Sequence, residues 1–114
     1  MKMRNETQFW FDLGPKDSIP KRGARTVRTP HREIAVFRTA SDEFFALENR
    51  CPHKGGPLSE GIVHGRKVAC PLHNWIIDLE DGEATGADKG CARSFPVKLE
   101  NGRIYLDMGV AAPA

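Results

Sequence analysis

Two short cysteine–histidine pairs constrain this chain more than any other feature. The first is Cys51-Pro52-His53 and the second is Cys70-Pro71-Leu72-His73, with sixteen residues between them. Each pair offers one soft thiolate and one imidazole, which are donors that zinc and iron both accept in proteins. A fold that uses all four donors must bring two distant loops to one place. We therefore expect a metal centre built by two loops within about residues 49–76.

The order of the donors within each pair separates two kinds of metal centre. Structural zinc sites usually pair like with like, as C-x-x-C followed by a pair of histidines. Here each pair is mixed, C-x-H and then C-x-x-H. This order suits two metal atoms, one held by both cysteines and the other by both histidines, as in a [2Fe–2S] cluster with mixed ligands. A structural zinc domain that serves only for binding is the alternative.

Length, charge and cysteine count exclude several classes of protein. At 114 residues we expect one domain over residues 1–110 and a flexible tail over 111–114. A net charge of +2 argues against a nucleic-acid binder. Three cysteines cannot form a complete disulfide framework. The sequence has neither a secretory signal nor a long apolar run, so we expect a cytoplasmic protein that does not enter the membrane.

The apolar pattern predicts an all-β protein. Eight prolines and eleven glycines leave no room for a long amphipathic helix. Short strands are expected over residues 7–13, 24–29, 33–39, 43–48, 61–64, 67–70, 75–79, 94–99 and 103–107. In the third of these strands, Ile34 and Val36 should face one way and Ala35 and Phe37 the other. The spacing is typical of an antiparallel sandwich or barrel, with the ligand loops at the tips of hairpins.

Turn residues set the limits of several strands. Gly14-Pro15 should end the first strand, and residues 15–23 read as a loop. Asn101-Gly102 predicts a type I′ hairpin turn, because both central residues of that turn need a positive φ. Pro96 lacks an amide hydrogen, so its strand should lie at the edge of a sheet.

The motif C-x-H…C-x-x-H resembles that of the Rieske [2Fe–2S] family, and the match covers about residues 33–108. This resemblance implies a Rieske-like antiparallel sandwich or barrel with a cluster-binding subdomain formed by two hairpin loops. It also implies one [2Fe–2S] cluster per chain, in which Cys51 and Cys70 bind one iron and His53 and His73 the other. The implied activity is one-electron transfer, with no catalytic residues of the chain's own.

Four positions depart from the respiratory and photosynthetic branch of that family. Gly56 and Leu72 stand where that branch has two further cysteines joined by a disulfide. Trp75 and Ile77 stand where it has a serine and a tyrosine that donate hydrogen bonds. Fewer donors to the sulfurs should lower the reduction potential. The chain therefore looks like a ferredoxin-type carrier fed by a nicotinamide–flavin chain.

Flanking segments point to a narrower resemblance. CPHKGGPLSEG and CPLHNWIIDLEDGEATGADKGCARSFPVKLENGRIYL are similar to the small subunit of assimilatory NAD(P)H nitrite reductase. That resemblance implies a large partner subunit with flavin, a [4Fe–4S] cluster and sirohaem, which reduces nitrite to ammonium in nitrogen assimilation. The small subunit would relay electrons. The alternative is a stand-alone Rieske ferredoxin that supplies an aromatic-ring dioxygenase.

The surroundings of the ligands suggest a docking surface. A small, largely apolar rim is expected to surround the exposed tip of the cluster and to dock the redox partner: Pro52, Lys54, Pro71, Leu72 and Asn74. Trp75 is expected to pack as core beneath the cluster, and a role as a shield against water is the second reading.

The remaining candidates are expected to be ordinary. Cys91 should be a semi-buried packing thiol, and His31 and His64 should lie at the surface. The basic run Lys21, Arg22, Arg25, Arg28 and Arg32 should be a solvated strand face, with an acidic partner's docking face as the alternative. The acidic cluster Asp78, Glu80, Asp81, Glu83 and Asp88 should form solvated turns.

Overall fold

The structure is a computed structural model that describes residues 10–29, 32–51, 56–71, 75–85 and 90–107. Within these ranges the chain forms ten strands and two short 3-10 turns, with no α-helix. The expectation of an all-β antiparallel fold is thus confirmed. None of the helices in the described part of the chain is long and apolar enough to span a membrane.

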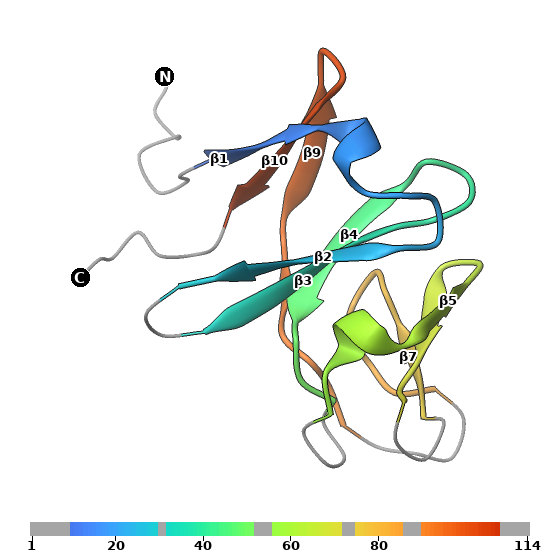
Figure 1. The fold of residues 1–114 in the computed structure, drawn as a ribbon. Helices are drawn as coiled ribbons and strands as arrows, with labels where there is room; N and C mark the ends of the chain where they lie inside the picture. The colour runs from blue at the N-terminus through green and yellow to red at the C-terminus, as the bar shows by residue number, and fades with distance from the viewer. Residues whose placement is uncertain (1–9, 30–31, 52–55, 72–74, 86–89, 108–114) are drawn as a thin grey trace.

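Three small antiparallel sheets make up the fold (Figure 1). The first has the strand order β1-β10-β9, formed by Trp10–Pro15, Arg103–Asp107 and Val97–Glu100. The second has the order β2-β3-β4-β8, formed by Ala24–Arg28, Glu33–Arg38, Phe44–Glu48 and Ser94–Phe95. The third has the order β5-β6-β7, formed by Ile62–His64, Lys67–Ala69 and Ile76–Asp78.

The second sheet is the middle layer, and strand β3 contributes to the core on both of its faces. Ala35 and Phe37 belong to a core cluster shared with the β5-β6-β7 sheet. Ile34 and Val36 belong to a second cluster shared with the β1-β10-β9 sheet. This is the predicted alternation, because successive side chains of a strand point to opposite faces. In Figure 1, β5 and β7 lie on the opposite side of the middle sheet from β1, β9 and β10.

Local turn chemistry agrees with the sequence at the C-terminal hairpin. Asn101 and Gly102 have φ values of 54° and 77°, as a type I′ turn requires. Pro96 stands between β8 and β9, each at the edge of its sheet. The expected single strand over 94–99 is thus two strands, because the chain passes from the middle sheet to the first sheet at a residue without an amide hydrogen.

Two further details differ from the sequence-based expectation. Strand β1 continues through Gly14 to Pro15, with an irregularity in its pairing to β10 between Asp12 and Gly14. Part of the expected loop over 15–23 is the 3-10 turn η2, Lys16–Ser18. Gly14 has a φ of 104°, so a glycine here bends the strand where the sequence pattern suggested that it ends.

Candidate metal centre

Both cysteines of the motif are buried in the same core cluster. Cys51 is 1% exposed and Cys70 is fully buried. They share this cluster with Leu58, Val68 and Ile77, which come from the 3-10 turn η3 (Leu58–Glu60) and from β6 and β7. Both are held as thiols rather than in a disulfide. Two buried sulfurs with an apolar surround are a suitable donor pair for a soft metal centre.

Each cysteine closes the base of its own loop through its backbone. The N–H of Cys51 donates to the carbonyl oxygen of Gly56 at 2.8 Å. The N–H of Cys70 donates to the carbonyl oxygen of Trp75 at 2.7 Å. Both bonds join residue i to residue i+5, and each histidine of the motif falls inside the span that is closed. The two loops therefore have matching bases, each beginning at a buried sulfur.

His53 and His73 lie outside the described residues, as do Pro52, Lys54, Leu72 and Asn74 of the expected rim. Pro71 is described, and it is exposed beside the buried Cys70. Among the described residues alone, no group of three or more cysteine, histidine or acidic residues gathers to hold a metal ion. The structure places the two cysteines in one core cluster, and the role of all four residues as ligands stays a prediction.

The positions after the second loop are apolar, as the sequence indicated. Trp75 is partly buried and packs against the core cluster that contains both cysteines, which confirms its expected packing role. Ile77 is fully buried in that cluster. The chain's one tyrosine, Tyr105, lies on β10 in the sheet on the far side of the middle layer. The aliphatic side chain of Ile77 therefore stands at the position where the respiratory and photosynthetic branch has a tyrosine hydroxyl.

The expectations for Cys91 and for His64 have different outcomes. Cys91 is exposed, so the expectation of a semi-buried thiol is wrong. Cys91 pairs with Glu83 in an isolated bridge outside the named strands, and its side chain lies at the surface. His64 is exposed at the end of β5, as expected. His31 lies outside the described residues.

The charged runs are mostly solvated. Lys21, Arg22, Arg25 and Arg28 are exposed, while Arg32 is half-buried with its guanidinium 5.4 Å from the centre of the Phe95 ring. In the acidic cluster Glu80, Asp81 and Glu83 are exposed, Asp78 is half-buried, and Asp88 is not described. The solvated reading of both runs agrees with these exposures.

Sequence reasoning missed two polar residues that join separate elements. Arg38 is buried, and its guanidinium binds the Asp42 carboxylate at 2.7 Å and the Ile19 carbonyl at 2.8 Å. This hydrogen bond from Arg38 lowers the pKa of the Asp42 carboxyl below its ordinary value. Asn49 joins Glu33 to Ser59 across the base of the first loop. The contacts to Ile19, Glu33 and Ser59 join residues that are distant in sequence, so no local spacing marks them. The pair of Arg38 and Asp42 is local, but acids and bases four residues apart are too common in sequences to single it out.

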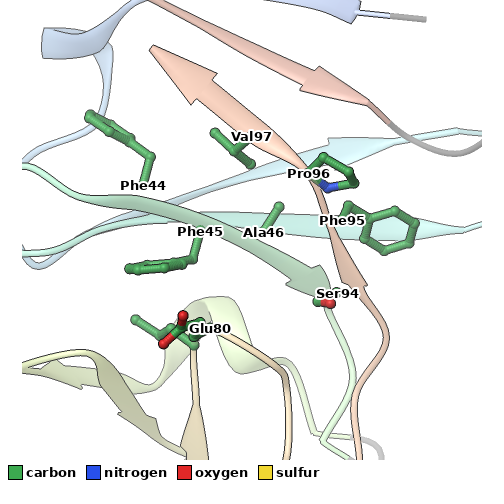
Figure 2. Close-up of a pocket in the computed structure, with 9 residues that line it drawn as sticks. Phe44, Phe45, Ala46, Glu80, Ser94, Phe95, Pro96 and Val97 are labelled. Atoms are coloured by element: carbon green, nitrogen blue, oxygen red, sulfur yellow. The ribbon is translucent and has the colours of Figure 1, made fainter. Parts of the chain in front are cut away.

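A pocket of about 400 Å³ lies apart from the two cysteines. Figure 2 shows it between β4 and the segment from Ser94 to Val97, where the two diverge beyond their last paired residue, Ala46. Phe44 and Phe45 point to opposite sides of β4 (Figure 2). The other walls are apolar except for one acid and one hydroxyl, Glu80 and Ser94. None of the residues that line this pocket belongs to the loop bases.

Comparison with known proteins decides the family. The model of the Rieske [2Fe–2S] domain matches residues 9–96. The chain belongs to the Rieske [2Fe–2S] domain family. A Rieske domain carries a [2Fe–2S] cluster, and its function is electron transfer within oxidoreductase systems. The buried sulfur pair fits that cofactor, because thiolates are the ligands of iron–sulfur clusters.

Two similar Rieske relatives are ferredoxins of dioxygenase systems. The ferredoxin component of the naphthalene 1,2-dioxygenase/salicylate 5-hydroxylase systems of Ralstonia sp is 36% identical over 104 residues, which cover 90% of this chain and 98% of the relative. The anthranilate 1,2-dioxygenase ferredoxin subunit of Burkholderia cepacia is 35% identical, with 88% and 93% covered.

Among solved Rieske structures, one similar protein is provisionally assigned as the NADH-dependent nitrite reductase small subunit of Mycobacterium tuberculosis. It has a TM-score of 0.81 and 25% identity, and the match covers 92% of this chain and 98% of that chain. Another match is to a complex of reduced oxygenase and oxidised ferredoxin in carbazole 1,9a-dioxygenase, with a TM-score of 0.78, 25% identity, and 88% and 94% covered.

Proposed function

We propose that this protein is a Rieske ferredoxin that carries single electrons from a reductase to an oxygenase. The observation that carries this proposal is the 36% identity to a dioxygenase ferredoxin component across 98% of that relative. The segments that flank the motif favoured a nitrite reductase small subunit over a dioxygenase ferredoxin. Identity across the whole domain favours the ferredoxin, and we give it more weight because it includes many more positions than those segments do. A cytoplasmic location would suit the proposal, since a reducing compartment keeps Cys91 and the buried cysteines as thiols.

We assign the cluster ligands as Cys51 and Cys70 on one iron and His53 and His73 on the other. Support comes from the burial of both sulfurs in one core cluster and from the matching i to i+5 bonds at the two loop bases. When bound, the [2Fe–2S] cluster accepts and gives up one electron at a time. Leu58, Val68 and Ile77 pack around the sulfurs and keep water from them.

The environment of the sulfurs supports a low reduction potential. Ile77 is fully buried, and its side chain supplies no hydrogen-bond donor. Hydrogen bonds to the sulfurs raise the potential of iron–sulfur clusters, so an aliphatic side chain at this place favours a carrier that gives up its electron readily. A carrier with a low reduction potential is suited to passing electrons to an oxygenase. Oxidation of a quinol would need a carrier with a higher potential.

A role as the small subunit of an NAD(P)H nitrite reductase is the second candidate. The TM-score of 0.81 to the Mycobacterium tuberculosis protein supports it, as do the segments that flank the motif. In that case the partner would be a large subunit with flavin, a [4Fe–4S] cluster and sirohaem. This chain would relay electrons to it and would perform no chemistry on nitrite.

Electron-transfer kinetics with purified partners separate the two candidates. The protein is reduced chemically and mixed in a stopped-flow instrument with the oxygenase or with the nitrite reductase large subunit encoded nearest to its gene. The ferredoxin proposal predicts rapid oxidation by the oxygenase, followed by turnover of its substrate when a reductase is added. Rapid exchange with the sirohaem subunit alone would instead support the second candidate. A colourless protein that contains only zinc would exclude both.

A further inference from the structure

The two ligand loops are held at their bases in different ways. The second loop lies at the tip of the β6–β7 hairpin, and its base continues the ladder in which Ala69 pairs with Ile76. The first loop leaves β4 and returns through η3 to β5. Strand β4 pairs with β3 and β8, whereas β5 pairs with β6. No strand ladder therefore joins the two ends of the first loop, and only the second loop is the tip of a paired hairpin.

The side chain of Asn49 makes the connection that the strands do not make. Its amide nitrogen donates to Glu33 Oε2 at 2.9 Å and to Ser59 Oγ at 3.0 Å. Its amide oxygen accepts the Ser59 N–H at 2.7 Å. A carboxylate can only accept and a backbone N–H can only donate, so these partners fix the orientation of the amide. The backbone N–H of Asn49 also donates to the Glu33 carbonyl at 2.8 Å.

Two tiers of hydrogen bonds thus close the first loop. The Cys51–Gly56 bond is the inner tier, and the Asn49–Ser59 pair is the outer tier. The two partners of the outer tier are themselves anchored to the fold. Glu33 begins the central strand β3, and Leu58, next to Ser59, is fully buried in the core that holds the cysteines. Asn49 is therefore placed to tie the start of the loop to the end of the loop.

We propose that Asn49 is the positioning residue of the first ligand loop, and that it does with a side chain what the β6–β7 ladder does for the second loop. It holds Cys51 against the core, because it ties the chain two residues before Cys51 to Glu33 and Ser59. This inference rests on the proposed cluster ligands. Its physical consequence is that removal of this one side chain should loosen the base of the first loop and speed the release of the cluster that both loops hold.

Hydrogen exchange in the metal-free protein tests the hydrogen bonds of the Asn49 side chain separately from the cluster. The Ser59 amide is the reporter, since its N–H is held by the Asn49 side chain. In Asn49→Ala we expect this amide to exchange at least about tenfold faster, because a lost side-chain hydrogen bond shifts a local opening by about this factor. The matched control is Thr39→Ala. It removes a buried side-chain acceptor that binds the N–H groups of Ser41 and Glu43, in a turn away from both loops.

Cluster release gives the second readout. The holo protein is mixed with an iron chelator, and loss of visible absorbance is followed. Asn49→Ala should release its cluster at least about tenfold faster than the wild type, while Thr39→Ala should stay within about twofold. Asn49→Asp sets a carboxylate beside Glu33 and should also accelerate release. In the double variant Glu33→Gln, Asn49→Asp, a Gln amide can donate to the new carboxylate, and release should return close to the wild-type rate.

The outcomes separate failure of this inference from failure of the proposed ligands. If Asn49→Ala matches Thr39→Ala in both Ser59 exchange and cluster release, Asn49 has no positioning role. If the double variant releases its cluster as fast as Asn49→Asp, the contact between Asn49 and Glu33 does not help to hold the loop. If the wild type binds no cluster, the proposed ligands fail, and the exchange measurement alone still decides whether Asn49 closes the loop.

Discussion

The N–H of Cys70 donates a 2.7 Å hydrogen bond to the carbonyl oxygen of Trp75, so the residue that supplies a buried sulfur also closes the loop that follows it. Cys51 and Gly56 repeat this relationship in the first loop. These bonds use backbone groups alone, and they hold each buried sulfur at the base of its loop. A base that is held in this way limits the reorganisation that cluster binding requires.

Serine variants of the motif cysteines should lose the cluster. Cys51→Ser or Cys70→Ser replaces a thiolate with a poor ligand for iron, and even changes outside the ligand shell cost about 10–100-fold in metal affinity. Iron and sulfide content should fall at least about tenfold in either variant. Cys91→Ser is the matched control, because Cys91 is exposed, and it should keep the full content. Equal losses in all three variants would contradict the assignment.

Gly61→Ala should destabilise the sheet that holds the second loop. A Cβ on Gly61 would overlap the carbonyl oxygen of Ala69, which is the residue before Cys70. Backbone cannot yield as a side-chain end can, so we expect a loss of about 2–3 kcal/mol in the free energy of unfolding. Gly65→Ala meets no atom within 4 Å but has a φ of 62°, and it should cost about 1 kcal/mol. Chemical denaturation compares the two, and equal losses would contradict the close approach.

The ion pair between Arg38 and Asp42 should make stability depend on acid pH. Its hydrogen bond lowers the pKa of the Asp42 carboxyl from 3.8, so the folded state favours the charged form. The stability it contributes is fully present above pH 3.8 and is lost as pH falls through the lower, folded pKa. The stability difference between wild type and Asp42→Asn should be constant above pH 3.8 and shrink as the pH falls below that value. A difference that stays constant down to pH 2 would argue against this ion pair.

A charge placed on the expected rim should slow transfer between proteins. Leu72→Asp changes a residue of that rim, which is expected to approach the redox partner closely. The rate of electron transfer to the partner should fall, and the absorption spectrum of the cluster should stay unchanged. Leu99→Asp is the control, because Leu99 is an exposed leucine, at 43%, on β9 in the sheet on the far side of the middle layer. If both variants transfer electrons at the wild-type rate, the rim is not the docking surface.

The sequence predicted those parts of the fold that depend on local pattern. Alternation along β3 gave both of its faces, and the Asn101-Gly102 pair gave its turn, because each depends on neighbouring residues. The division of 94–99 into two strands was missed, since it depends on which sheet each half joins. Exposure of Cys91 was missed for a similar reason, because a thiol reads as a packing residue until its surroundings are known.

In the candidate site, too, the sequence predicted what depends on local pattern and missed what depends on tertiary pairing. The motif pointed to the cysteines, and their burial in one cluster agrees with it. The Asn49–Ser59 pair has no motif, because it is needed only where the first loop lacks a strand ladder at its base. That lack appears only once β4 and β5 are known to lie in different sheets. The placing of β4 and β5 in different sheets is therefore what gives Asn49 its proposed positioning role, and the sequence pattern does not reveal it.

Electron–nuclear double resonance on the reduced protein, labelled with nitrogen-15 histidine, tests the proposed ligand set most directly. The assignment predicts hyperfine coupling from two imidazole nitrogens, with one coupling lost in His53→Cys or His73→Cys. His64→Ala should keep both couplings, since His64 is an exposed residue at the end of β5. A reduced cluster without histidine coupling, or with coupling that persists in both cysteine variants, would contradict the proposed ligands.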